Sequence, residues 1–343
     1  MLEIDGSYGT GGGQLVRNAV ALSALTGTAV RIRSIRAGRD KPGLAPQHLT
    51  AVKAVGEICS ARIDRLELRS REIAFEPGPV RGGAFAFDVG TAGSVTLVLQ
   101  ALLPVMVAAR ADFRVEIRGG TDVRAAPPLD YLRRVLLPLI SRMGAKVRVE
   151  AKRRGYYPRG GGLVEATVAP SALHGVQLDA PGRLLRIEGL AHVAHLPAHI
   201  AERMRASALG KLGAFAATAS CGIEVPQDAD AFGQGGALVM WATREGGVLG
   251  AGRVAERGLR AETLGESVGA ELAADLAAGA ALDLHAADQL LVYLALAGGR
   301  SSFGVREVSE HARTAMWLIE QFVPVRFATS QKAGIAHVAV SPA

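Results

Sequence analysis

Three of the eight histidines of this chain, His48, His285 and His311, fall in the first turn of a segment expected to be helical. The positive end of a helix dipole disfavours the imidazolium ion, which lowers the histidine pKa from about 6.5 and leaves a neutral ring. Neutral imidazole is a nucleophile that can attack phosphorus. A first-turn histidine can equally be a surface residue or a polar cap, and spacing alone does not decide between these roles.

A glycine-rich turn, GSYGTGGGQ at 6–14, joins an expected strand to an expected helix. In such a turn backbone N–H groups and the positive helix end can face a phosphate. The turn lacks the GK[ST] of a Walker A motif, and its spacing differs from the dinucleotide-binding fingerprint. It can therefore be either a phosphate cradle or a tight packing turn.

The charge of the chain is unevenly distributed. Lys and Arg number 39 against 32 Asp and Glu, and residues 1–183 alone hold 26 basic against 16 acidic residues. A basic excess of this kind predicts affinity for nucleic acid or nucleotides. The preference for Arg, 33 against 6 Lys, can also reflect genome composition. The tightest basic cluster is Arg31, Arg33, Arg36, Arg39 and Lys41.

Other features argue against several classes of protein. His192, His195 and His199 suggest a metal site, but Pro197 prevents one helix from aligning all three. Two cysteines cannot form a disulfide framework and fit a reducing cytoplasm. The uncharged run 89–109 is interrupted by Gly, Ser, Gln and Pro, so we expect a buried helix there. We therefore expect a cytoplasmic protein that does not bind membranes.

The elements that would position these residues recur in similar blocks. Each block begins with a strand, a Gly- or Ala-bearing turn and a helix, at 2–27, 84–109 and 282–299. A strand and a second helix follow each, and the second helices are expected at 46–61, 127–145 and 309–324. This pattern predicts an α/β (α+β) body of three repeated units, in which helices cover sheets.

The third block is interrupted. We assign to it the early strands within 146–170, which the segment 184–277 separates from the helices of the block. That segment has strands and two helices of its own, at 197–212 and 261–278, and a slightly acidic balance. We expect a large domain built from 1–183 and 278–343, and a small inserted domain at 184–277.

The chain resembles the RNA 3′-terminal phosphate cyclase family in seven motifs, which are GSYGTGGGQLVRNAVALS, SIRAGRDKPGLAPQHLTAVKA, GTAGSVTLVLQALLP, GGTDVRAAPPLDYLRRVL, GYYPRGGG, LHAADQ and EHARTAMWLIEQFVPVRF. The resemblance covers nearly the whole chain. It implies a large domain of three α2β4 repeats, shared with enolpyruvyl transferases, and an inserted α/β domain of thioredoxin-like arrangement. The implied enzyme uses ATP to convert an RNA 3′-phosphate to a 2′,3′-cyclic phosphodiester, through a covalent adenylyl-histidine and an RNA(3′)pp(5′)A intermediate, and releases AMP and diphosphate.

The resemblance also implies residue roles. His311 matches the nucleophile of the family. The nucleotide contacts match Gln100, Pro127, Tyr131, His285, Ala286, Ala287, Asp288 and Gln289. The residues that handle the RNA end match Arg17, Arg36, Arg39, Gln47 and His48, where guanidinium forks suit phosphate oxygens. Arg31 and Arg33 stay outside this set, because alternation along a strand would place them in solvent.

One position departs from the family pattern. The family commonly has GEGGG in the first loop, with Glu near the divalent metal, whereas this chain has Thr10. A hydroxyl binds a hard cation more weakly than a carboxylate does. We still expect Mg²⁺ or Mn²⁺ to screen the triphosphate, but the protein ligand is unknown, and metal preference or ATP affinity can be altered.

Three other functions remain open. A non-catalytic scaffold in RNA processing would lack the nucleophilic histidine, which His311 argues against. Enolpyruvyl transfer on a related fold would need no covalent AMP. Adenylylation of nucleic-acid 5′-phosphate ends is a conceivable side activity. Because no sequence-specific RNA module is visible, we expect little base preference at the chain end. The sequence does not predict the natural RNA or the oligomeric state.

Overall fold

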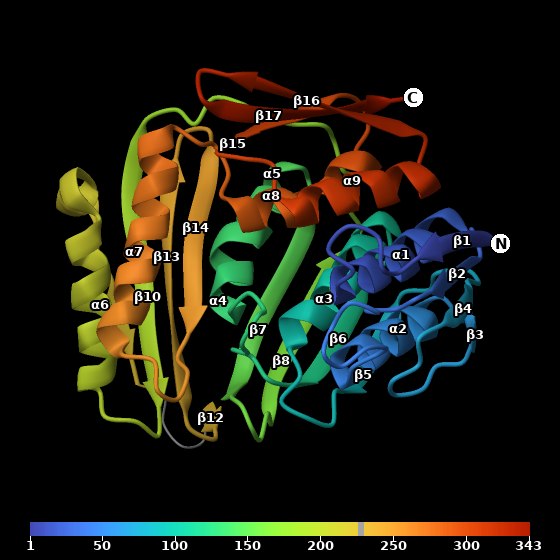
Figure 1. Cartoon of the computed structure of the whole chain (residues 1–343), viewed down its shortest axis with the longest axis horizontal. Helices are drawn as coiled ribbons and strands as arrows, with labels where there is room; N and C mark the ends of the chain where they lie inside the picture. Colours follow the sequence, from blue (N-terminus) through green and yellow to red (C-terminus); the bar gives the residue numbers. More distant parts are fainter. Residues whose placement is uncertain (226–229) are drawn as a thin grey trace.

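The computed structural model describes residues 1–225 and 230–343 as a mixed α+β fold, and the strands within these ranges form four sheets (Figure 1). The N-terminal sheet has the order β1-β2-β4-β3. Its strands are β1 (Leu2–Asp5), β2 (Val30–Arg33), β3 (Arg62–Asp64) and β4 (Ile73–Glu76). Helices α1 (Gly13–Thr26) and α2 (Pro46–Ile58) connect them.

The second sheet has the order β12-β7-β8-β6-β5. Its strands are β5 (Gly83–Asp88), β6 (Phe113–Gly119), β7 (Lys146–Gly155), β8 (Gly162–Ala169) and the short edge strand β12 (Ala231–Phe232). Helix α3 (Val95–Ala108) follows β5. The helical segment after β6 consists of α4 (Leu129–Tyr131), the π-helical turn η1 (Leu132–Leu136) and α5 (Leu137–Arg142). Pro138 explains the wide turn, because its ring cannot donate a hydrogen bond and crowds the preceding carbonyl.

The third sheet has the order β16-β17-β15-β9. Its strands are β9 (Gln177–Leu178), β15 (Ser301–Val305), β16 (Val325–Lys332) and β17 (Ile335–Pro342), with helices α8 (Leu284–Leu296) and α9 (Glu310–Phe322). In each of these three sheets the first two strands in chain order are parallel, namely β1 with β2, β5 with β6, and β9 with β15. The other pairs in these sheets are antiparallel, except that the edge strand β12 pairs parallel with β7.

Two expectations about the third unit are wrong. The strands within 146–170 belong to the second sheet, where β8 pairs antiparallel with β6 and places Val168 opposite Phe113. The first strand of the third sheet is instead β9, whose two residues are too few to show any periodicity in the sequence. Residues 282–284 form no strand, since Asp283 caps α8.

The fourth sheet lies in the chain between β9 and α8 and has the order β11-β10-β13-β14. Its strands are β10 (Leu184–Ala194), β11 (Gly222–Glu224), β13 (Gly235–Arg244) and β14 (Gly247–Val254). Helices α6 (His199–Lys211) and α7 (Ala261–Ala278) pack against each other and against this sheet, and the 3-10 turn η2 (Gly213–Thr218) follows α6. Their apolar residues form a separate buried cluster that includes Ile187, Leu238 and Leu272.

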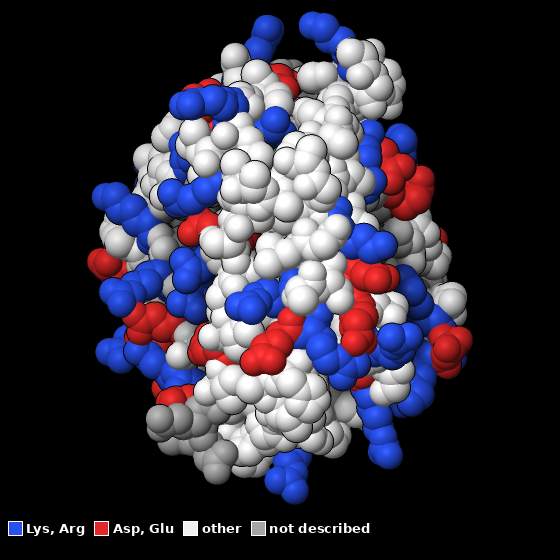
Figure 2. Space-filling view, turned by 90° about the vertical axis from the view of Figure 1, so that its left-hand side faces the viewer, with Lys and Arg blue, Asp and Glu red and all other residues white. Residues whose placement is uncertain are grey.

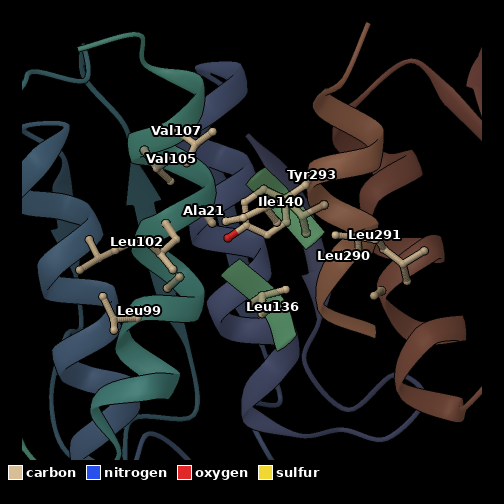
Figure 3. Packing of buried hydrophobic residues seen from close by; sticks show 14 of the residues in the cluster. Ala21, Leu99, Leu102, Val105, Val107, Leu136, Ile140, Leu290, Leu291 and Tyr293 are labelled. Atoms are coloured by element: carbon tan, nitrogen blue, oxygen red, sulfur yellow. The ribbon is translucent and has the colours of Figure 1, made fainter. Parts of the chain in front are cut away.

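The main core lies between the helices of the other three units. Figure 3 shows members of this core on different helices, among them Leu102 of α3, Leu136 of η1 and Leu290 of α8. Helix α3 is buried along most of its length, which explains why the run at 89–109 carries no charge. Within the described ranges, no helix combines the length and apolar character needed to cross a membrane.

Candidate active site

A cleft of about 370 Å³ lies where the N-terminal ends of several helices meet. The first turns of α1, α2, α8 and α9 line it, together with α3 and the segment 125–127. The first N–H groups of a helix have no partner within the helix, and the dipole favours negative charge there. The cleft therefore has the electrostatics of an anion site.

Three arginines bring positive charge into this cleft. Arg17 is only 6% exposed; its Nη2 donates to Gln100 Oε1 at 3.2 Å, and its buried Nε has no hydrogen-bond partner within residues 1–225 and 230–343. Burial lowers the pKa of Arg17 to about 10. Arg36 donates to two backbone carbonyls and Arg39 to the carbonyl of Thr10. No carboxylate of the described residues pairs with these guanidiniums, so their charge is available to a ligand.

Arg31 and Arg33 behave differently. They lie on β2 and form ion pairs with Glu3 at 3.4 and 3.3 Å, on the outer face of the first sheet. Their side chains remain partly in solvent, as the alternation along the strand predicts. Of the basic cluster identified in the sequence, the cleft thus receives Arg36 and Arg39.

His48 is buried at the start of α2, and its ring is held in a defined tautomer. Its Nδ1 accepts a hydrogen bond from the backbone N–H of Ala45 at 3.2 Å, so the proton of the neutral ring is on Nε2. Nε2 approaches Gly13 so closely that a Cβ there would lie 2.0 Å away. Burial, with Arg17 and Arg36 nearby, lowers the pKa of His48 to about 3. The ring is therefore a neutral hydrogen-bond donor at physiological pH.

His311 lies in the first turn of α9 and lines the cleft. Ser309 caps this helix, accepting a hydrogen bond from the N–H of Ala312 at 2.9 Å. The pKa of His311 is lowered by partial burial and by the positive charges of Arg39, His285 and Arg17. The ring is accordingly neutral near pH 7, the state that a nucleophile requires.

Asp283 organises the beginning of α8. Its Oδ1 accepts hydrogen bonds from the N–H groups of His285 and Ala286 and from the Tyr131 hydroxyl, and its Oδ2 accepts one from the N–H of Gly250 in β14. The His285 ring meets Tyr131 edge-on, with centroids 6.2 Å apart. One carboxylate thus fixes α8, α4 and the fourth sheet relative to one another.

Asp288, one turn further along α8, faces the same cleft. It accepts a 2.5 Å hydrogen bond from the Ser309 hydroxyl, which ties α8 to the start of α9. Burial raises the pKa of Asp288 to about 6, although the bond to Ser309 opposes this effect. Its carboxylate can accept a hydrogen bond from a bound ligand once it is ionised.

Amide side chains connect the helices across the floor of the cleft. Gln100 accepts from Arg17 and donates to Gln289 Oε1 at 2.7 Å, while Gln289 Nε2 donates to the carbonyl of His285. Gln47 accepts a hydrogen bond from the N–H of Ser94 at the start of α3. The bond to Gln100 positions Arg17 without neutralising its charge.

A second cavity of about 650 Å³ adjoins the first and shares Pro127, His285 and His311 with it. Tyr131 lines this second cavity and not the first. Thr263 and Ser267 of α7 form part of its wall. His311 therefore lines both this cavity and the first one, the basic chamber that contains Arg17, Arg36 and Arg39.

The structure brings most of the expected site residues to these two cavities, but not all of them. The side chains of Ala286 and Ala287 are buried in the main core. Sequence reasoning missed Gln14 and Asn18, which line the first cavity one turn apart with Arg17 on α1. Their helical spacing after a glycine-rich turn was the available signal. It also missed Asp283, although an Asp directly before a helix is a typical N-cap.

The described residues contain no group of three or more His, Cys, Asp or Glu that could hold a metal ion. Near the glycine-rich turn two buried oxygens, Thr10 Oγ1 and Gln14 Oε1, find no hydrogen-bond partner in the part of the chain that the structure describes. Gln14 lines the first cavity, and its neutral oxygen suits a cation whose other ligands come from phosphates. The ring of His192 lines neither cavity. Its Nε2 lies 3.1 Å from Arg154 Nη1, and its Nδ1 lies 3.1 Å from the Tyr156 hydroxyl.

Charge on the outer surface is arranged differently. On the side of the molecule that carries α6, acidic and basic residues are interspersed and form no continuous basic area (Figure 2). Several of these charges pair across the surface, such as Arg203 with Glu262 at 2.6 Å. In the cleft, by contrast, no carboxylate of the described residues pairs with Arg17, Arg36 or Arg39.

Comparisons of the sequence with known proteins identify its family. The sequence profile of the family described as RNA 3′-terminal phosphate cyclase matches residues 8–329. The chain is 55% identical to an "RNA 3′-terminal phosphate cyclase" of Nitrosospira multiformis, over 100% of this chain and 97% of that protein. It is 45% identical to the one of Methanopyrus kandleri, over 97% and 96%, and 46% identical to the one of Hyperthermus butylicus, over 94% and 92%.

Proposed function

Because the chain belongs to the RNA 3′-terminal phosphate cyclase family, we propose that it uses ATP to convert an RNA 3′-phosphate end to a 2′,3′-cyclic phosphodiester. The observation that carries this proposal is Arg17, a buried guanidinium with an unpartnered Nε at the floor of the cleft. A buried cation without a carboxylate is costly unless an anion joins it. A phosphate group fits, since it matches the geometry of a guanidinium fork.

The reaction needs ATP because oxide is a poor leaving group from a phosphate monoester. We propose that the neutral His311 ring attacks the α-phosphorus of ATP, so that a P–N bond forms and the bond to diphosphate breaks. An oxygen of the RNA 3′-phosphate then attacks the same phosphorus, the P–N bond breaks, and RNA(3′)pp(5′)A results. The lowered pKa of His311 supports this role, since it keeps the ring unprotonated.

Ring closure follows when the neighbouring ribose 2′-oxygen attacks the activated 3′-phosphorus, loses its proton, and displaces AMP. This step is intramolecular and favoured by proximity. Arg17, Arg36 and Arg39 would hold the phosphate oxygens. His48, neutral with its proton on Nε2, would donate a hydrogen bond to the same anion, and Gln47 would orient the start of α3 through Ser94.

The adenosine would occupy the second cavity, where Pro127 and Tyr131 flank the base and the His285 ring lies beside it. Asp288 would accept a hydrogen bond from a ribose hydroxyl, with Gln100 and Gln289 lining the path to the phosphates. Because Ala286 and Ala287 are buried in the core, their only contribution would be to hold the first turn of α8 in place.

A divalent ion, Mg²⁺ or Mn²⁺, would enter with the triphosphate and neutralise its charge. The orphaned Gln14 oxygen supports a place for it at the glycine-rich turn. With Thr10 in place of a carboxylate, most ligands of the ion would come from the phosphates and water.

We also propose that residues 1–183 and 278–343 form one cytoplasmic catalytic domain of three α2β4 repeats, like enolpyruvyl transferases, into which a thioredoxin-like domain of residues 184–277 is inserted. The shared strand order of three sheets supports the repeats. The separate apolar cluster around Ile187 and Leu272 supports the insertion.

The test is conversion of an oligonucleotide that carries a labelled 3′-phosphate, with ATP and Mg²⁺ or Mn²⁺. The proposal expects the label to become resistant to phosphatase only when ATP is present. Label that stays phosphatase-sensitive with either metal would favour a non-catalytic scaffold. Comparing substrates that differ in the terminal base tests the expected lack of base preference, and a 5′-phosphorylated strand tests the side activity.

A further inference from the structure

An aromatic pair beside the cleft, Tyr8 and Trp317, takes no part in the chemistry proposed above. The two rings are stacked, with centroids 3.8 Å apart and planes inclined by 21°. Tyr8 is 43% exposed, and Trp317 is also partly exposed. A stacked pair that remains open to solvent leaves aromatic surface available to a further planar group.

The pair is tied to the nucleophile through the glycine-rich turn. His311, Thr314 and Trp317 follow one another at three-residue spacing on α9, so Trp317 begins about 9 Å along the helix axis from His311. The turn lies along this row, because Gly9 has a positive φ and leaves no room for a Cβ beside Thr314, whose hydroxyl accepts from the N–H of Thr10.

The other end of the turn reaches the cleft. Gly12 and Gly13 line it together with His311, and Arg39 donates a hydrogen bond to the carbonyl of Thr10. The turn from Tyr8 to Gly13 therefore connects the aromatic pair to the basic chamber, and Arg39 lies alongside it without a carboxylate partner among the described residues.

The direction of the displacement at phosphorus indicates which ligand lies next to the glycine-rich turn. Diphosphate leaves, and the RNA phosphate enters, on the side of the α-phosphorus opposite the His311 nitrogen, because in-line displacement places both there. If adenosine fills the second cavity, that side is the basic chamber next to Gly12 and Arg39. An RNA strand whose 3′-phosphate is held there can lead out over the glycine-rich turn.

We propose that Tyr8 and Trp317 form a stacking platform for a base of the substrate RNA near its 3′ end. This inference rests on the proposed function, of which it names the RNA subsite. Every base has an aromatic face, so stacking adds affinity without base preference, by about 5- to 150-fold for one base.

The first experiment compares two 3′-phosphorylated oligonucleotides without ATP, one intact and one with abasic sugars at its last positions. The abasic strand keeps the charges and loses the aromatic faces. We expect the wild-type chain to bind the intact strand about 5- to 150-fold more tightly. Equal affinity for the two strands would overturn the inference.

Variants test whether Tyr8 and Trp317 cause the preference for the intact strand. Tyr8→Ala and Trp317→Ala should reduce the preference for the intact strand, whereas Tyr8→Phe should retain it. The matched control is Tyr157→Ala, which removes a tyrosine that is 76% exposed and lies outside both cavities. A preference that survives in both alanine variants would overturn the inference.

Fluorescence gives a readout that does not depend on the stability of an alanine variant. Trp241, 9% exposed and donating to Glu188, is the other tryptophan of the chain. In a Trp241→Phe protein the intact oligonucleotide should quench the emission of Trp317, and in a Trp317→Phe protein it should leave the emission of Trp241 unchanged. Absence of quenching in the first protein would contradict stacking.

The two proposals can fail separately. Base-dependent binding without cyclic product would contradict the proposed function and leave the platform intact. Cyclic product, formed by a protein that binds intact and abasic strands equally, would contradict only the platform.

Discussion

The Tyr131 hydroxyl donates a 2.6 Å hydrogen bond to Asp283 Oδ1, and both residues are buried. The same carboxylate caps α8 and holds β14 through the N–H of Gly250. Burial and the charge of Asp283 raise the pKa of Tyr131 well above its usual value. The hydroxyl is thus a permanent donor, and the wall of the second cavity depends on it.

Tyr131→Phe should reduce the free energy of unfolding by about 1–3 kcal/mol, because one donor to a buried carboxylate is lost. Urea denaturation measures this change. The control is Tyr293→Phe, at an equally buried tyrosine of α8 for which no hydroxyl hydrogen bond occurs within residues 1–225 and 230–343. Equal losses in the two variants would show that the bond to Asp283 contributes nothing specific.

Arg17→Gln should raise the KM for the RNA 3′-phosphate by about 10- to 150-fold, since a charged hydrogen bond to phosphate is lost. The same change should stabilise the ligand-free protein by about 1–2 kcal/mol, because it removes a buried charge that lacks an anion. Steady-state kinetics and urea denaturation measure the two effects. Arg31→Gln, at an arginine already paired with Glu3, should change the KM little. Loss of stability together with an unchanged KM would give Arg17 a purely structural role.

Self-adenylylation should increase as the pH rises from 5 to 7. Both groups lose a proton as the pH rises: Asp288, whose pKa is raised to about 6, and His311, whose pKa is lowered from its usual value. Single-turnover labelling at several pH values measures the profile. In Asp288→Asn the limb near pH 6 should disappear, which leaves only the rise that belongs to His311. A variant that keeps the wild-type limb would contradict this assignment.

Thr10→Glu should lower the concentration of Mg²⁺ or Mn²⁺ that gives half-maximal activity, because a carboxylate binds a hard cation more strongly than a hydroxyl. Titration of each metal at fixed ATP measures this change. Thr10→Gln, of the same size without the charge, is the control. An identical metal requirement in all three proteins would place the ion away from the glycine-rich turn.

The sequence allowed much of this architecture to be predicted, because amphipathic helices and glycine-rich turns are local features. Helices α2 and α9 start within one residue of the expected positions, at Pro46 and Glu310, since proline and serine mark such starts. The strands at 146–170 were given to the wrong unit because strand pairing is a long-range property that alternation does not encode.

The same distinction applies to the site. Some of its features follow from the local sequence, and others depend on contacts between segments that are distant in the sequence. The first-turn placement of His48 and His311 was visible in the sequence, but the causes of their lowered pKa values are burial and arginines from other segments. The tautomer of His48 depends on the N–H of Ala45, and the place of Asp283 depends on β14. Such contacts appear only when the chain is folded.

The most direct test of the central claim is incubation of the purified protein with α-labelled ATP and Mg²⁺ or Mn²⁺, followed by denaturing electrophoresis, with His311→Ala in parallel. We expect label on the wild-type protein only, and its release when 3′-phosphorylated RNA is added. Label on His311→Ala, or cyclic product formed by that variant at the wild-type rate, would contradict it.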